Sequence, residues 1–128
     1  MLAVLGLMFL GFDPSVLTIP PEMMVVPELP KEWTVEEMKT LATSTAAKYG
    51  LTNNQTTRLL NVINCESRWV ATSTSPTGDF GVVQINKRFH PEVTMEQAFD
   101  PAWSIEWMIK HWANGRYSMW VCYTILYG

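Results

Sequence analysis

Basic residues are scarce in this sequence and do not cluster. Lysine and arginine number 9 among 128 residues, against 12 aspartates and glutamates, which gives a net charge of −3. Lys87-Arg88 is the only adjacent basic pair. Because binding to the phosphate backbone of nucleic acids depends on clustered positive charge, we expect no nucleic-acid partner.

The sequence also lacks an apolar run of the roughly 20 residues that a membrane-spanning helix needs. Residues 1–12, MLAVLGLMFLGF, are nearly all apolar and have the length of a signal-peptide core, without preceding basic residues or a clear cleavage site. The alternative is a buried N-terminal helix. We favour an export or membrane-anchor segment, because the five prolines of residues 13–32 exclude a continuous helix and indicate an extended linker. The chain is then exported, to the periplasm, the cell surface or the medium.

Cysteine occurs only twice, at Cys65 and Cys122, so there is no dense disulfide framework. Residues 33–128 are numerous enough to bury a core without one. In an exported chain the two cysteines would pair, whereas in the cytosol they would be buried thiols, and we favour the disulfide. A zinc site built from them with His90 and His111 matches no ligand spacing, so we expect no metal and no cofactor.

Residues 33–128 predict one mainly helical domain with a small β element, in the α+β class. Capping boxes, in which a threonine is followed three residues later by Glu or Gln, predict helices that begin after Thr34, Thr52 and Thr94. Asp100-Pro101 start a further helix and Asn114-Gly115 end it. The apolar segment 117–127 fits a helix or a strand, and we favour a helix. Most tryptophans should lie in the core, and both histidines should be structural.

The β element is predicted just after the second helix. Residues 72–78 are rich in hydroxyl residues, proline and glycine, which is typical of a turn-rich loop. Phe80 to Ile85 then predict one strand, with Phe80, Val82 and Gln84 on one face. Gly81 indicates a close approach of backbone or ligand.

Glu66 is the candidate acid of this region. It follows Leu59, Val62 and Ile63 by seven, four and three residues, which places it on the apolar face of the second helix. Partial burial disfavours a charged carboxylate and raises its pKa. A lone glutamate at a helix end is usually an ordinary surface charge, so the interpretation depends on the residues around it.

Those residues resemble the signature of the soluble lytic transglycosylase (SLT) domain of the lysozyme-like superfamily. The family's serine and glutamine follow its glutamate by nine and eighteen residues, as Ser75 and Gln84 follow Glu66 here. Residues 78–86, GDFGVVQIN, are also similar to a strand of c-type animal lysozymes, with Asp79 in the place of an aspartate. The specific part of the resemblance covers residues 65–86.

The resemblance implies a lysozyme-like fold that cleaves the glycan strands of peptidoglycan. In the SLT family the glutamate protonates the leaving oxygen and then, as a base, closes a 1,6-anhydro ring; in lysozymes a second carboxylate takes part and water completes the reaction. The substrate-binding residues implied are Ser67, Ser75, Gln84 and Asn86. The family's tyrosine that touches the catalytic glutamate has its candidate in Tyr123, although the surrounding residues match poorly.

We therefore expect a monomeric lytic transglycosylase that cleaves the β-1,4 bond between N-acetylmuramic acid and N-acetylglucosamine, with Glu66 as acid and base. Asp79 departs from the SLT pattern and leaves open a hydrolytic muramidase that uses Glu66 with Asp79. A non-catalytic wall-binding module is the third hypothesis. The structural alternatives are that Ser67 only ends the helix, Ser75 only shapes a turn, and Asp79 only starts one.

Overall fold

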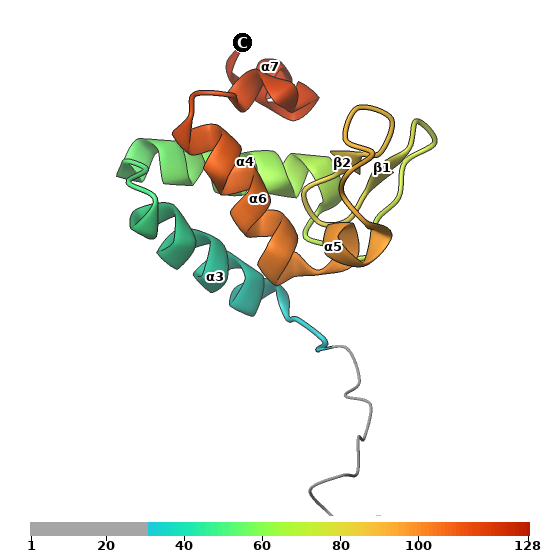
Figure 1. The fold of residues 1–128 in the computed structure, drawn as a ribbon. Coiled ribbons are helices and arrows are strands. Elements are labelled where there is room, and N and C mark those ends of the chain that lie inside the picture. Colours follow the sequence, from blue (N-terminus) through green and yellow to red (C-terminus); the bar gives the residue numbers. More distant parts are fainter. Residues whose placement is uncertain (1–30) are drawn as a thin grey trace, which may run out of the picture. The chain divides into compact units, whose positions relative to one another are not determined.

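The computed structural model describes residues 31–128, and Glu32–Gly128 form one compact unit. The predictions for residues 1–12 and for residues 13–30 of the linker lie outside the described residues. The unit is mainly helical with a small two-stranded sheet. Its elements, shown in Figure 1, are α3 (Val35–Lys48), α4 (Asn53–Ser67), β1 (Asp79–Phe80), β2 (Ile85–Asn86), α5 (Met95–Phe99), α6 (Pro101–Ala113), the 3-10 turn η2 (Tyr117–Met119) and α7 (Val121–Tyr127).

Four helices begin where local sequence signals predicted. The capping box forms at Thr34, Thr52 and Thr94. Each threonine hydroxyl accepts a hydrogen bond from the backbone amide three residues later, and the Glu or Gln side chain at that position accepts one from the threonine amide. Asp100 caps α6 through the Ala102 amide, with Pro101 in the first turn. These bonds satisfy amides that a helix start leaves unpaired, so each start is specified by residues close in sequence.

One hydrophobic core joins the helices to the sheet. Side chains of α4 and α6 that are at most 1% exposed form one cluster with Val82 and Val83, which lie between the strands, and with Ile85 of β2. The members at the centre are Leu59, Val62, Ile63, Val82, Val83, Ile85, Ile105, Met108, Ile109 and Trp112. Each such side chain contributes roughly 1.5–3 kcal/mol by its burial. The end of α4 is therefore fixed relative to the sheet.

The prediction of one continuous strand from Phe80 to Ile85 is wrong. Phe80 instead pairs with Ile85 across an antiparallel hairpin, and Asp79 pairs with Asn86. The chain reverses over residues 81–84 because Gly81 and Gln84 have φ angles of 86° and 57°, which a strand does not contain.

The close approach predicted at Gly81 is an approach to backbone. A Cβ at this position would overlap the carbonyl oxygen of Ala98 in α5. Only glycine combines this contact with a positive φ at little cost. Gly81 therefore sets how closely the hairpin packs on α5.

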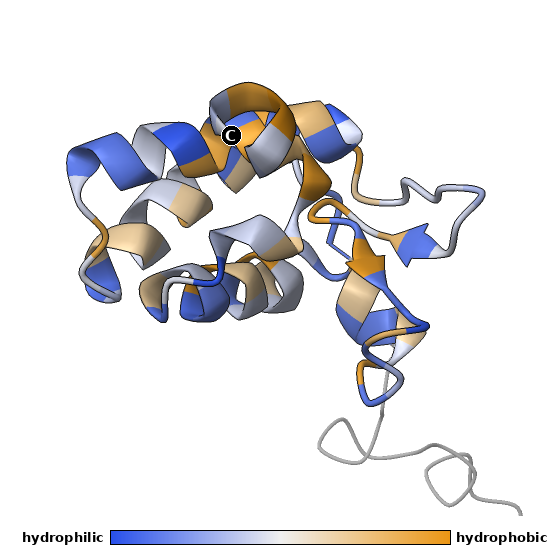
Figure 2. Cartoon of the chain, turned by 90° about the horizontal axis from the view of Figure 1, so that it is seen from above, coloured by the Kyte–Doolittle hydropathy of each residue, from blue (hydrophilic) through white to orange (hydrophobic). Residues whose placement is uncertain are grey.

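The apolar segment 117–127 is helical, as favoured, but in two pieces, η2 and α7. Of the residues of α7, only Cys122 is buried. Val121, Ile125 and Leu126 are 65%, 69% and 45% exposed, and Figure 2 shows this hydrophobic surface beside the C-terminus. No helix within residues 31–128 is both long and apolar enough to cross a membrane.

Candidate active site

Glu66 is the penultimate residue of α4, at the end nearest the hairpin (Figure 1). Its carboxylate is partly buried, and its Oε2 accepts a hydrogen bond from the backbone amide of Cys122 at 3.2 Å. Burial raises the pKa of Glu66 above its ordinary value; the Cys122 amide opposes this rise, and the negative charge of Asp79 adds to it. Glu66 therefore keeps its proton to a higher pH than an exposed glutamate does.

The chain leaves α4 through a strained turn that Ser67 supports. Arg68 and Trp69 have φ angles of 54° and 64°, in the left-handed region that is costly for residues other than glycine. Ser67 is 7% exposed, and its Oγ accepts from the Trp69 amide at 3.1 Å and donates to the Val82 carbonyl at 2.6 Å. The hydroxyl predicted to bind substrate is thus engaged with backbone, and we assign Ser67 to holding α4 against the hairpin.

Asp79 is surrounded by three side-chain donors. Ser75 Oγ and Thr77 Oγ1 donate to its Oδ2 at 2.6 and 2.8 Å, and Asn86 Nδ2 donates to its Oδ1 at 2.9 Å. Burial alone would raise the pKa of Asp79, but the bonds from Ser75, Asn86 and Thr77 together lower it below its ordinary value. Ser75 and Asn86, predicted as substrate contacts, therefore act on Asp79, which carries its negative charge even in mildly acidic solution.

Glu66 and Asp79 form a pair of carboxyl groups whose pKa values are moved in opposite directions. At a pH between the two values, Glu66 holds a proton that it can donate while Asp79 is an anion. Two carboxyl groups divided in this way can serve as an acid and as a stabilising or attacking partner in one reaction. The charge of Asp79 also contributes to the raised pKa of Glu66, so the two carboxyl groups interact electrostatically.

Gln84 completes the turn of the hairpin. Its Nε2 donates to the carbonyl oxygens of Gly81 at 2.9 Å and Ser73 at 3.2 Å, which ties the turn to the preceding loop. The amide thus has the hydrogen-bond partners that its apolar surroundings require. Because Gln84 also lines the cleft described next, it is both a brace of the hairpin and a polar group open to a ligand.

A cleft of about 300 Å³ lies against the hairpin. Its lining combines polar side chains, among them Asp79, with aromatic ones. Its lining residues are Asp79, Gln84, Ile85, Asn86, Phe89, His90, Trp107, Met119 and Trp120. Glu66 is not among them; its carboxylate is bound to Cys122, two residues after Trp120. The cleft is thus bordered by Asp79 and by the segment that holds Glu66.

The aromatic part of the lining is built from rings that pack edge to face. Trp107 makes such contacts with His90, Trp120 and His111, with centroids 4.9, 5.9 and 4.4 Å apart. Trp120 is 4% exposed, and its Nε1 donates to the Val83 carbonyl at 2.8 Å. The pKa of His111 is lowered by burial and by the charges of Arg116 and His90, against a smaller opposing effect of Glu92. Packed aromatic rings and polar groups in the lining of one cleft suit a sugar ring, which has both kinds of surface.

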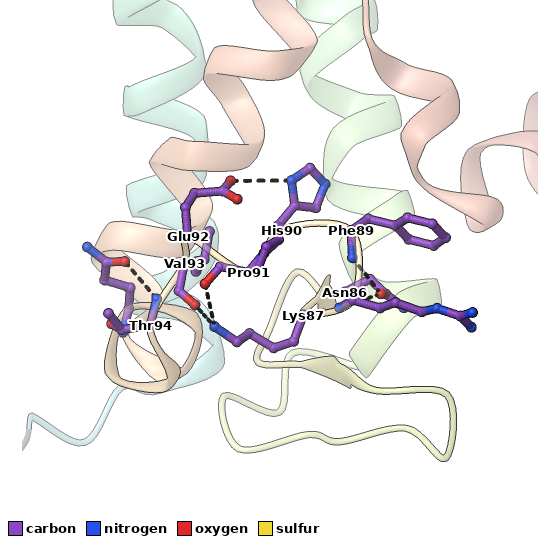
Figure 3. Close-up of polar contacts among 10 residues, drawn as sticks. Asn86, Lys87, Phe89, His90, Pro91, Glu92, Val93 and Thr94 are labelled. Atoms are coloured by element: carbon purple, nitrogen blue, oxygen red, sulfur yellow. Dashed lines mark hydrogen bonds and ion pairs between the residues drawn. The ribbon is translucent and has the colours of Figure 1, made fainter.

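The segment between β2 and α5 presents Phe89 and His90 to the cleft (Figure 3). Asn86 Oδ1 accepts from the Phe89 amide at 3.3 Å, and His90 Nδ1 lies 3.5 Å from a carboxylate oxygen of Glu92. The Lys87 ammonium donates to two backbone carbonyl oxygens of the same segment, those of Pro91 and Val93. Phe89 is 73% exposed although its loop is held by these bonds. It forms a flat apolar surface at the edge of the cleft.

A disulfide joins Cys65 and Cys122, the pairing that the sequence favoured. The structure places Tyr123 away from the role predicted for it: its hydroxyl accepts from Arg58 Nη1 at 3.3 Å, and its ring stacks on Tyr117. The group from this segment that contacts Glu66 is the Cys122 amide. No sequence signal identifies it, because every residue except proline carries a backbone amide.

Within the part of the chain that the structure describes, no group of three or more His, Cys, Asp or Glu side chains could hold a metal ion. Comparisons with family models, with curated proteins and with solved structures found no match to this chain. The function is therefore argued from the two carboxyl groups and the cleft.

Proposed function

We propose that this chain is a peptidoglycan glycosidase with a lysozyme-like fold, in which Glu66 is the general acid. The observation that carries the proposal is a pair of carboxyl groups whose pKa values are displaced in opposite directions. Asp79 lines the cleft, and Glu66 is bound to Cys122, two residues after the lining residue Trp120. Cleavage of a glycosidic bond needs a proton for the leaving oxygen and negative charge near the anomeric carbon as positive charge develops there. Glu66 supplies the first and Asp79 the second.

The substrate class comes from the resemblance of residues 65–86 to SLT domains and c-type lysozymes. We infer cleavage of the β-1,4 bond between N-acetylmuramic acid and N-acetylglucosamine in glycan strands. The cleft supports a sugar ligand, because its lining combines the aromatic rings of Trp107 and Trp120 with the polar groups of Gln84 and Asn86. The disulfide supports an exported protein, since such bonds persist in oxidising compartments.

The hydrolytic reaction, in which water completes the cleavage, is the version that the geometry favours. Three donors keep Asp79 ionised, and an anion has a role in hydrolysis by two carboxylates. Lytic transglycosylation is the second candidate, and the spacing of Glu66, Ser75 and Gln84 supports it. In that reaction Glu66 would take a proton from the 6-hydroxyl of the sugar and would need no second carboxylate.

The products distinguish the two reactions. Intact peptidoglycan is incubated with the full chain, and the soluble fragments are weighed by mass spectrometry. Hydrolysis gives reducing muramoyl ends, whereas transglycosylation gives 1,6-anhydro ends that are lighter by one water molecule. A wall-binding module would sediment with peptidoglycan and release neither fragment, which would overturn the proposal.

A further inference from the structure

We propose that the Cys65–Cys122 disulfide is a redox-controlled latch, which holds α7 on α4 and thereby keeps the Cys122 amide on the Glu66 carboxylate. The inference rests on the proposed function of Glu66 as an acid and adds a means of regulating the same site. Its basis is that the disulfide joins the residue before Glu66 to the residue whose amide binds the Glu66 carboxylate.

One cysteine is next to Glu66 in sequence, and the other provides the amide that binds it. Cys65 directly precedes Glu66 in α4, and Cys122 supplies the amide that donates to Glu66 Oε2 at 3.2 Å. The disulfide holds their Cα atoms 6.0 Å apart, although 57 positions separate them in sequence. The bond therefore fixes the donor next to its acceptor, which the chain connects only through the whole hairpin, α5 and α6.

Besides the disulfide, α7 is held by two half-buried tyrosines, Tyr123 and Tyr127, which pack against the core. It is 7 residues long, only Cys122 in it is buried, and no side chain caps its start at Trp120. Helices of this length are not stable alone in water. Val121 and Ile125 face solvent, 65% and 69% exposed. Its docking thus depends on the contacts of one face with α4 and on the rings of Trp112 and Tyr117, which pack against Tyr123.

Of the other polar contacts between α7 and α4, one is half-buried and one is exposed. Arg58 Nη1 donates to Tyr123 Oη at 3.3 Å, and Asn61 Nδ2 donates to Tyr127 Oη at 2.9 Å. The Arg58 guanidinium also lies 4.4 Å from the centre of the Tyr127 ring. Such contacts exchange readily with water and are weak individually. They can guide α7 back to its place but hold it less firmly than a covalent bond.

Reduction by a dithiol would open the latch. A thiolate of the dithiol attacks a sulfur of the disulfide, the Cys65–Cys122 bond breaks, each cysteine sulfur gains a proton, and the dithiol closes into its own disulfide. Two electrons pass from the dithiol to the cysteines. Cys65 is exposed, which gives the thiolate access. In a reducing compartment the site then lacks its amide donor, and in an oxidising one the site is complete.

Hydrogen exchange of the full chain tests the latch without reference to activity. Dithiothreitol is added at a temperature at which circular dichroism shows that the helices persist. We expect the α7 amides to exchange at least 10-fold faster after reduction, while those of α3 and α6 keep their rates. Unchanged exchange in α7 would overturn the latch. Equal acceleration in all helices would also overturn it, because the bond would then stabilise the whole fold instead of one helix.

Peptidoglycan clearance tests the regulation. The oxidised chain should lose at least 10-fold of its rate on reduction, because a released α7 no longer positions the Glu66 carboxylate through the Cys122 amide, and it should regain the rate on reoxidation. The Cys65→Ala/Cys122→Ala variant should have the low rate with and without dithiothreitol, which controls for effects of the reagent on the substrate. Clearance that persists while α7 exchanges faster would overturn the regulation. If the oxidised chain clears no cell wall, the proposed function fails, and hydrogen exchange still decides the latch.

Discussion

Burial and, to a smaller extent, the charge of Asp79 raise the pKa of Glu66, whereas hydrogen bonds from Ser75, Asn86 and Thr77 lower the pKa of Asp79 against the effect of its own burial. The two carboxyl groups come from different elements, α4 and β1, which share one core. Because the core fixes both elements, the difference between the two acids is a property of the fold. Five expectations follow from this arrangement and from the packing that maintains it.

Replacing Glu66 with Gln should abolish activity and stabilise the protein at neutral pH. Glutamine cannot donate the proton, which should lower the rate of peptidoglycan cleavage by about 10²- to 10⁴-fold. The raised pKa of Glu66 means that the folded state binds its proton more tightly than the unfolded state does. Stability is therefore highest below the ordinary value of 4.5 and falls as pH rises through the raised pKa. The variant should escape this loss, which thermal unfolding at neutral and acidic pH would show.

Glu96→Gln is the matched control for that variant, because Glu96 is an exposed glutamate at the start of α5. It should change neither the activity nor the pH dependence of unfolding. Cleavage at the parent rate by the Glu66→Gln protein would remove Glu66 from the mechanism.

Replacing Asp79 with Asn tests the role of the second carboxylate. The side chain keeps its size and loses its charge, so hydrolysis should slow by about 10²-fold or more. The pKa of Glu66 should fall, because the charge that raises it is gone. Carbon NMR of the labelled Glu66 carboxyl would measure that change. Retention of activity within a few-fold, with anhydro products, would assign the reaction to transglycosylation by Glu66 alone.

The pH profile of kcat/KM should have two limbs. Activity should fall as pH rises through the raised pKa of Glu66, since the acid loses its proton. It should fall again as pH decreases through the depressed pKa of Asp79, below its ordinary value of 3.8. The stability that Asp79 contributes is likewise present above 3.8 and lost as pH falls through the depressed value. In Asp79→Asn the acidic limb should disappear, and a profile that keeps both limbs would refute its assignment to Asp79.

Gly81→Ala should destabilise the fold far more than the same change at Gly50. The new methyl at residue 81 would overlap the Ala98 carbonyl and also suffer the strain of a φ of +86°. We expect a loss of at least about 3 kcal/mol in the free energy of unfolding. Gly50 has a φ of +81° and open space around it, so its substitution should cost only the strain, about 1–2 kcal/mol. Equal losses of unfolding free energy for the two variants in denaturant titrations would mean that the hairpin can move away from α5 at little cost.

Ser67→Ala should be costly and Ser104→Ala should not. Ser67 Oγ bonds the Val82 carbonyl and the Trp69 amide, and its removal leaves both without this partner, at about 1–3 kcal/mol. Ser104 is fully buried, and its hydroxyl has no hydrogen-bond partner in the described structure. Alanine there should be neutral or stabilising. The same order should appear in the midpoints of chemical unfolding, and a reversal would mean that Ser67 does not hold the turn.

Local signals in the sequence predicted the helices well. The capping threonines Thr34, Thr52 and Thr94 bond to residues only three positions away, so the pattern contains all the partners that matter. The burial of Glu66 was also predictable, because helical spacing places it on the apolar face of α4. These features depend on residues that are neighbours along the chain or on one helix.

Features that depend on distant partners were not predictable. The alternation from Phe80 to Ile85 resembles a strand, but the contact of Gly81 with α5 and the positive φ of Gln84 turn it into a hairpin. The spacing from Glu66 singled out Ser75 as a site residue, but it did not show that the Ser75 hydroxyl bonds to Asp79. The Cys122 amide has no side-chain signature at all.

The segment between Cys65 and Cys122 contains β1, β2, α5, α6 and η2. During synthesis Cys65 and Glu66 therefore emerge long before the residue that completes their surroundings. Both the disulfide and the hydrogen bond from Cys122 to Glu66 can therefore form only after these elements have been synthesised.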